Sequence, residues 1–375
     1  MKEDWETQRL GDLFTFKNGR AFKKEEWTDQ GLPIIRIQNL NREDASFNYF
    51  AGEYGQDIFV NPGDLLFSWS GTIGTSFGSH IWSGEPGLLN QHIFKVAHRE
   101  TISRRYAFYG LRFITAEIEK SVSGAVGLVH ITKEKLNEFT LSLPPLPEQQ
   151  RIVALLDEAF AGLATAKANA EQNLQNARAL FESHLQSVFT ERGEGWVETA
   201  LESCCEQIFA GGDVPKDRLS KVRTSQYSVP IYSNGEKDNG LYGFTDIARV
   251  AKPSVTVSAR GTLGFSVIRT EPFLPVVRLI VLVPDAEQIS LPFLYYTVVG
   301  MDFGNTGTSI PQLTVPNIKE SILRVPPLSE QKTIVEKLDA LTDEIQRLTR
   351  LYERKLASLE ELKKSLLHQA FNGEL

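Results

Sequence analysis

The sequence has 375 residues, of which 41% are hydrophobic and 10% aromatic, a composition typical of a folded protein with two or three domains. Its formal net charge is −7, so the chain as a whole lacks the basic excess that contacts with nucleic-acid phosphates usually require. The two cysteines, Cys204 and Cys205, are adjacent, which excludes a disulfide framework and the spaced ligands of a zinc site.

The amino terminus and the hydropathy pattern predict no membrane segment. Residues 1–10 are charged and lack the apolar stretch of a secretory signal. No run of 18 or more apolar residues occurs. We therefore expect a cytoplasmic protein.

Residues 1–143 predict a first α+β domain. Short apolar runs at residues 65–69 and 92–96 are bounded by turn residues and predict strands. Residues 104–120 predict a helix.

Residues 144–192 predict a long helix. Pro144 and Pro145 end the preceding strand, and Pro147 and Glu148 lie where a helix begins and its dipole favours acidic groups. Apolar residues then recur in steps of four and three, the pattern of a coiled-coil seam. This seam consists of Ile152, Leu156, Ala159, Leu163, Ala166, Ala170, Leu174 and Ala177.

Residues 193–325 repeat the first domain weakly. Residues 255–259 and 276–283 predict strands, and residues around 291–299 predict a helix. The segment Ser-Gly-Thr-Ile-Gly at 70–74 resembles Arg-Gly-Thr-Leu-Gly at 260–264.

Residues 326–375 repeat the long helix at an offset of 182 residues. Nine of the fifteen residues at 143–157 recur at 325–339, including Pro-Pro-Leu-x-Glu-Gln. Two successive four-residue steps interrupt both seams at the same place. The second seam consists of Ile334, Leu338, Leu341, Ile345, Leu348, Tyr352, Leu356 and Leu359.

These repeats predict an α+β protein in which two pseudo-two-fold related domains are joined by two long antiparallel coiled-coil helices. The first domain is expected at 1–143, a central spacer helix at 144–192, the second domain at 193–325 and a C-terminal spacer helix at 326–375. Two unrelated surface helices, packed on separate domains, are the alternative.

Motifs of catalysis are incomplete in this sequence. No Walker-A motif and no glycine fingerprint for S-adenosylmethionine or a dinucleotide occur. Residues 61–64 resemble part of the methyltransferase NPPY box without its aromatic residue, and residues 284–288 resemble a nuclease core without its lysine. The six histidines are scattered without metal-ligand spacing, so we expect no catalytic and no metal site. A serine–histidine–aspartate triad stays open, although the nucleophile elbow is absent.

The order of the motifs resembles that of the specificity (S) subunits of type I restriction–modification systems. The resemblance covers nearly the whole chain, and its most specific feature is Pro-Pro-Leu-x-Glu-Gln at the start of both long helices. The matching segments are 31–40, 61–74, 124–153, 229–246, 255–264 and 307–335.

The resemblance implies a non-catalytic subunit that reads a bipartite site in double-stranded DNA. Each α+β domain would then be a target recognition domain for one half-site, and the helices would fix the spacer between the halves. Two methyltransferase (M) subunits and restriction (R) subunits are the implied partners. They would carry S-adenosylmethionine, ATP and Mg, leaving no cofactor in this chain. The assembled complex would be a DNA adenine methyltransferase and ATP-dependent endonuclease.

Two other functions remain open at this point. The chain is alternatively an enzyme of a restriction–modification system that carries its own methylation site, or a two-armed scaffold for protein partners. Binding of S-adenosylmethionine by the isolated chain distinguishes the first, and DNA binding with M subunits distinguishes the second.

Base-reading residues are predicted from residue type, because Arg pairs well with guanine, and Asn or Gln with adenine, in the major groove. Polar residues in or beside the glycine-rich loops are the candidates. In the first domain they are Lys17, Asn18, Arg20, Arg36, Gln38, Asn39, Ser70, Thr72, Gln91 and His130. In the second domain they are Lys216, Asn234, Lys237, Arg260, Thr262, Arg278 and Gln312.

Overall fold

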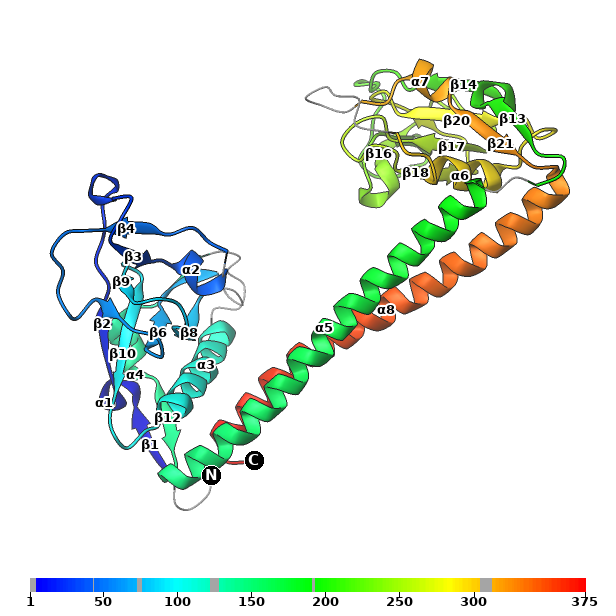
Figure 1. The fold of residues 1–375 in the computed structure, drawn as a ribbon. Helices are drawn as coiled ribbons and strands as arrows, with labels where there is room; N and C mark the ends of the chain where they lie inside the picture. Colours follow the sequence, from blue (N-terminus) through cyan, green and yellow to red (C-terminus); the bar gives the residue numbers. More distant parts are fainter. Residues whose placement is uncertain (1–4, 43, 73–75, 122–127, 191–192, 304–311) are drawn as a thin grey trace. The chain divides into compact units, whose positions relative to one another are not determined.

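The computed structural model describes the chain apart from residues 1–4, 43, 73–75, 122–127, 191–192 and 304–311, and the chain divides into two compact units. Unit 1 contains Met1–Ala170 and Arg354–Leu375, and unit 2 contains Glu171–Glu353. Helices α5 (Leu146–Thr190) and α8 (Leu328–Asn372) each contribute one part to each unit (Figure 1). Among the described residues, neither these helices nor any other is apolar enough over sufficient length to span a membrane.

Unit 1 contains two four-stranded sheets and two strand pairs. The central sheet has the antiparallel order β2-β10-β6-β8, and the second sheet has the order β4-β3-β9-β5 with one parallel pair, β3 and β9. The strands are β1 (Glu6–Arg9), β2 (Phe14–Asn18), β3 (Leu32–Ile35), β4 (Asn48–Phe50), β5 (Phe59–Val60), β6 (Leu65–Ser68), β7 (Ser70–Thr72), β8 (Gly78–Ile81), β9 (Gly87–Leu89), β10 (Ile93–His98), β11 (Leu128–His130) and β12 (Thr140–Leu143).

The helices of unit 1 lie mainly beside the central sheet. Besides the long helices they are α1 (Leu10–Leu13), α2 (Ile37–Asn41), α3 (Arg104–Ser121) and α4 (Lys133–Glu138). A 3-10 turn, η1, covers Lys24–Glu26. The helix predicted at residues 104–120 is confirmed as α3.

Unit 2 repeats the central sheet of unit 1, whereas its second sheet has three described strands, in the order β16-β15-β19, in place of four. Its central sheet has the order β14-β20-β17-β18, and strands β15 and β19 form the parallel pair of its second sheet. The strands are β13 (Val197–Ala200), β14 (Cys205–Ala210), β15 (Val229–Tyr232), β16 (Leu241–Thr245), β17 (Ser254–Val257), β18 (Ser266–Arg269), β19 (Leu274–Pro275), β20 (Ile280–Pro284) and β21 (Ile322–Val325). The remaining elements are η2 (Leu201–Cys204), η3 (Lys237–Gly240), α6 (Leu291–Val299) and α7 (Val315–Lys319).

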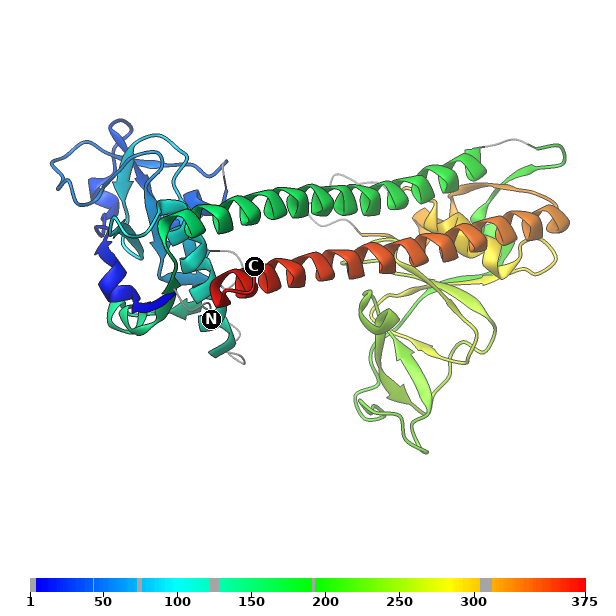
Figure 2. The same ribbon diagram turned by 90° about the horizontal axis from the view of Figure 1, so that it is seen from below.

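The two long helices confirm the repeat read from the sequence. Each has 45 residues and is therefore about 68 Å long. In unit 1 the beginning of α5 lies beside the end of α8, where Lys167 Nζ is 3.0 Å from Glu360 Oε1 and the Arg151 guanidinium donates to the backbone oxygen of Leu375 at 2.8 Å. Residue numbers increase along α5 from Arg151 to Lys167, while those of their partners decrease along the chain from Leu375 to Glu360. The two helices are therefore antiparallel, as both views show (Figures 1 and 2).

The predicted apolar seams face inward along both helices. Ile152, Leu156, Ala170, Ala177 and Leu338 are buried, and the other seam residues are half-buried. Pattern and burial agree along both seams, and the contacts between α5 and α8 in unit 1 exclude two unrelated surface helices.

Each α+β domain shares one hydrophobic core with its part of the helix pair. In unit 1 the aromatic residues Phe16 and Phe67 of the sheet, Tyr106 of α3 and Phe371 of α8 belong to one buried cluster with Leu156 of α5. In unit 2 a corresponding cluster joins the sheet, α6, Leu185 of α5 and Leu338 of α8. Each unit therefore contains a domain and its helix segments as one packed body.

Replacing Leu156 with alanine tests this shared core. The side chain is 1% exposed, so we expect unit 1 to lose roughly 2–5 kcal/mol of unfolding free energy through a buried cavity. Leu155, the preceding residue, is 41% exposed, and its replacement by alanine should cost less than about 0.5 kcal/mol. Urea unfolding followed by circular dichroism measures both, and equal losses would contradict the shared core.

Candidate nucleic-acid interface

The same backbone turn precedes the central strand in both units. The Gly19 amide donates to the Ile93 carbonyl at 3.1 Å in unit 1, and the Gly211 amide donates to the Leu279 carbonyl at 2.8 Å in unit 2. The residue before each acceptor has a left-handed backbone, with φ of 75° at His92 and 62° at Arg278. Neither residue is glycine, so each turn is strained, and strain of this kind is concentrated at functional sites.

The turn of unit 1 carries an aromatic cluster. The Trp69 ring centroid lies 4.9 Å from that of His92 and 6.0 Å from that of His130. Trp69 Nε1 donates to Asn18 Oδ1 at 2.9 Å, which brings the end of β2 to the same place. Asn18, Trp69, His92 and His130 form the first platform, in which a predicted asparagine and a predicted histidine flank two residues that the sequence did not single out.

Gln91 and Lys17 lie at exposed positions beside the first platform. The backbone amide of Gln91 donates to the Arg20 carbonyl at 2.9 Å, and Gln91 directly precedes the strained residue His92. The Arg20 side chain is held by Glu26 and lies 4.8 Å from the Phe50 ring centroid. The guanidinium group of Arg20, a predicted DNA-binding residue, is therefore used in contacts within the chain.

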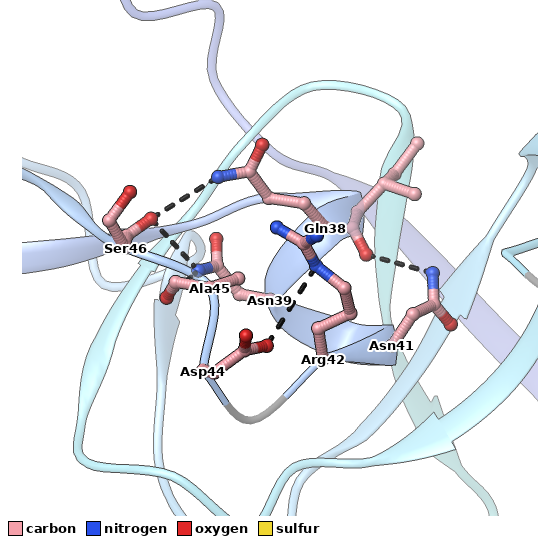
Figure 3. Close-up of polar contacts among 8 residues, drawn as sticks. Gln38, Asn39, Asn41, Arg42, Asp44, Ala45 and Ser46 are labelled. Carbon is pink, nitrogen blue, oxygen red and sulfur yellow. Dashed lines mark hydrogen bonds and ion pairs between the residues drawn. The ribbon is translucent and has the colours of Figure 1, made fainter. Parts of the chain in front are cut away.

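The loop after β3 is shaped by one asparagine (Figure 3). Asn39 is 9% exposed, its Oδ1 accepts from the Arg36 amide at 3.0 Å, and its Nδ2 donates to the carbonyls of Ala45 at 3.1 Å and Ser46 at 3.3 Å. Exposed Gln38 also donates to the Ser46 carbonyl, at 3.2 Å. Asn39 therefore holds the loop together from within.

The remaining candidates of the first domain differ in exposure. The Arg36 guanidinium lies 5.6 Å from the Trp27 ring centroid, and its Nε is buried without a partner among the described atoms. Ser70 is 4% exposed, whereas Thr72 is exposed at the end of β7.

The turn of unit 2 is held by Asn234. Its Nδ2 donates to the Val277 carbonyl at 2.6 Å, and its Oδ1 accepts from the Ala259 amide at 2.8 Å. Val277 is left-handed as well, with φ of 54°, an uncommon state for a β-branched residue. Asn234 therefore ties the strained turn to the end of β17.

Charged and amide side chains gather beside this turn. The Arg260 guanidinium donates to Gln312 Oε1 at 3.2 Å, and Arg278 is exposed on the turn itself. Asn234, Arg260, Arg278 and Gln312 form the second platform, so the structure brings together four residues that the sequence predicted. Arg260 and Gln312 occupy the positions of Ser70 and His130 in unit 1, because Leu313 and Ile131 donate equivalent backbone hydrogen bonds at 3.0 Å.

Three candidates of the second domain lie apart from these contacts. Lys216 is exposed on a loop, and Lys237 is exposed at the start of η3. Thr262 is half-buried, and its Oγ1 has no hydrogen-bond partner among the described residues.

The two segments that resemble incomplete catalytic motifs contain turns in the structure. The Asp64 carboxylate accepts from the Asn61 amide at 2.9 Å, and the Asp285 carboxylate accepts from the Glu287 amide at 3.1 Å. Among the described residues, no three His, Cys, Asp or Glu side chains are grouped to hold a metal ion.

Comparison with known proteins gives consistent matches over the whole chain. The family model for the type I restriction modification DNA specificity domain matches residues 2–175 and 193–355. The chain is 24% identical over 421 aligned residues to the type I restriction enzyme EcoBI specificity subunit of Escherichia coli, an alignment that covers 100% of this chain and 86% of that protein. It is 31% identical over 291 residues to a putative type I specificity subunit of Mycoplasma pneumoniae, covering 73% of this chain and 82% of that one.

A solved structure shares the fold. It comes from work on complex assembly and conformational transition of the type I restriction–modification system, and its chain superposes with a TM-score of 0.83. The identity is 19%, and the superposition covers 100% of this chain and 99% of the other.

Replacing Arg278 with glycine tests the strain at the turn. Glycine adopts the left-handed region without the penalty of about 1–2 kcal/mol that a side chain incurs there, so we expect unit 2 to gain about 1 kcal/mol of unfolding free energy. Arg260→Gly is the matched control, because Arg260 is equally exposed and has no positive φ, and we expect it to be neutral or destabilising. Urea unfolding that shows the same change in both variants would refute strain at position 278.

Proposed function

The chain belongs to the type I restriction modification DNA specificity family, and we propose that its two platforms each read one half of a bipartite DNA site. The family is one of non-catalytic DNA recognition subunits. Our proposal adds which part of each domain approaches the bases. It also places the two reading domains at 1–143 and 193–325.

The repeated turn is the observation that carries this proposal. His92 and Arg278 occupy the same position in the two units, and both side chains leave a strained backbone at the end of the central sheet. Glycine would form this turn without strain, so a turn with a purely structural role favours glycine at this position. A side chain kept there in both units at the cost of backbone strain supports a role in binding.

The side chains at the two platforms suit different bases. Arg260 and Arg278 supply guanidinium groups that pair with guanine, and Gln312 supplies an amide that pairs with adenine. The first platform offers the Asn18 amide beside the Trp69 and His130 rings, which suit an adenine and an adjoining apolar thymine methyl. The two halves of the DNA site should therefore differ in sequence.

Partner subunits complete the function in this proposal. We infer that the chain assembles with two M subunits and, for cleavage, with R subunits, which bring S-adenosylmethionine, ATP and Mg. Partners with basic surfaces also reconcile DNA binding with a net charge of −7, since they supply much of the phosphate contact. The long helices would hold the two reading domains at a fixed separation.

The test is selection of bound DNA from a random library by the assembled complex of the chain with its M subunits. We expect one motif composed of two specific halves and a non-specific spacer of constant length. A continuous motif, or no enrichment at all, would rule the proposal out.

Exchanging residues 1–143 for the first domain of another family member tests whether the readers are independent. Because each unit has its own core and its own platform, only one half of the selected motif should change. The same library selection measures it. A change in both halves would show that the two domains do not read separately.

Arg260→Ala and Arg278→Ala test the second platform directly. Each loses a guanidinium that pairs with a base, so discrimination at one position of one half-site should fall by roughly 1–3 kcal/mol. The other half-site is the internal control and should keep its sequence preference. Equal weakening for all sequences would instead assign these arginines to the phosphate backbone.

A further inference from the structure

The first turn of α5 carries a fully buried glutamine. Gln149 is 0% exposed, and its Oε1 accepts from the Ser103 amide at 2.8 Å. Its Nε2 donates to the carbonyls of Thr101 and Pro144, both at 2.9 Å. One carboxamide therefore joins the start of the long helix, the end of the domain's last strand and the residue that precedes α3.

The first turn of α8 carries the same arrangement. Gln331 is 0% exposed, its Oε1 accepts from the Ser290 amide at 2.8 Å, and its Nε2 donates to the carbonyls of Gln288 and Pro326 at 2.9 Å. Ser290 precedes α6 as Ser103 precedes α3. We call these two arrangements the glutamine bridges.

A second contact joins each domain to its long helix at an aspartate, eight residues after the buried glutamine. The Tyr109 hydroxyl of α3 donates to Asp157 of α5, and the Tyr296 hydroxyl of α6 donates to Asp339 of α8 at 2.6 Å. Burial, followed by the hydrogen bond to Asp157, raises the pKa of Tyr109 to about 12, so the hydroxyl keeps its proton at neutral pH. Burial likewise raises the pKa of Tyr296.

Two contacts on one helix resist rotation of the domain better than one. Eight residues of α-helix separate the glutamine from the aspartate by about 12 Å along the axis. A domain held at both points cannot pivot about one of them without breaking the hydrogen bonds at the other, and polar groups left without partners cost free energy. The orientation of α3 or α6 on its long helix is therefore fixed.

We propose that the two glutamine bridges, each together with its tyrosine–aspartate contact, are positioning elements that set how strictly the protein selects the length of the DNA spacer. The proposal rests on the function proposed above, in which each domain reads one half-site. None of the bridge residues belongs to a platform, so they act on DNA only through the orientation of the domain.

The geometry of DNA explains why orientation controls the spacer. One additional base pair moves the second half-site by about 3.4 Å and turns it by about 35° around the duplex. A domain fixed on its helix cannot follow that rotation, and the altered site is rejected. A domain freed to pivot follows part of it, and the altered site is accepted.

The experiment measures spacer selectivity of the assembled complex with its M subunits. The DNA probes carry both selected half-sites and spacers from two base pairs shorter to two base pairs longer than the selected length. Gln149→Met keeps the side-chain volume and removes all three hydrogen bonds. Gln150→Met is the matched control, because Gln150 is exposed in the same helical turn.

We expect Gln149→Met to lower the preference for the selected spacer over its neighbours by about tenfold, or about 1.4 kcal/mol, while the half-site sequences stay unchanged. The control should keep the wild-type preference. Reduced binding to all spacers alike would indicate a merely structural role and overturn the proposal, and so would an unchanged preference in the assembled variant.

If the Gln149→Met variant does not assemble with the M subunits, Tyr109→Phe and Tyr296→Phe test the proposal instead. Each of these variants removes only one hydroxyl group and the hydrogen bond that it donates. We expect a smaller loss of spacer preference in both, and wild-type preference in both would overturn the proposal. A wild-type complex that selects no bipartite site would contradict the proposed function itself, which keeps the two failures distinct.

Discussion

A buried carboxamide in the first turn of each long helix is the contact on which the arrangement of each unit depends. Gln149 and Gln331 are each 0% exposed, and their side-chain carboxamide groups each make three hydrogen bonds to backbone groups. Such groups are costly to leave unpaired, so the helix can begin in only one direction relative to its domain. The shared hydrophobic cores then extend this fixed start into one body per unit.

The packing of each unit holds its strained turn in one position. His92 and Arg278 lie at the end of the central sheet, whose strands pack against α3 or α6. Asn234 and the backbone pairing of Gly19 and Gly211 hold these turns in place. In the function proposed above, the backbone of each turn is already fixed before DNA binds, so binding costs little backbone conformational freedom at these residues. In the two proposals above, base reading and positioning belong to different residues of the same domain.

The sequence predicted the parts of the fold that depend on periodicity and on repetition. The seams of α5 and α8, and the helices α3 and α6, follow from local pattern alone. Residue type also identified Asn18, His130, Arg260 and Gln312, which the structure brings to the platforms. It did not indicate Trp69 or His92, because a left-handed φ and a ring cluster arise only from tertiary contacts. For the same reason it did not separate exposed amides from Asn39 and Asn234, whose polar atoms are used within the chain.

The central claim is that the long helices fix the distance between two independent readers. Inserting four residues after Ala166 lengthens α5 by about 6 Å, close to one helical turn, so the seam stays on nearly the same face. The spacer of the DNA motif selected by the assembled complex is the direct measurement. Our account predicts that it lengthens by about one to two base pairs while both half-sites keep their sequence. An assembled, DNA-binding variant with an unchanged spacer would contradict the account.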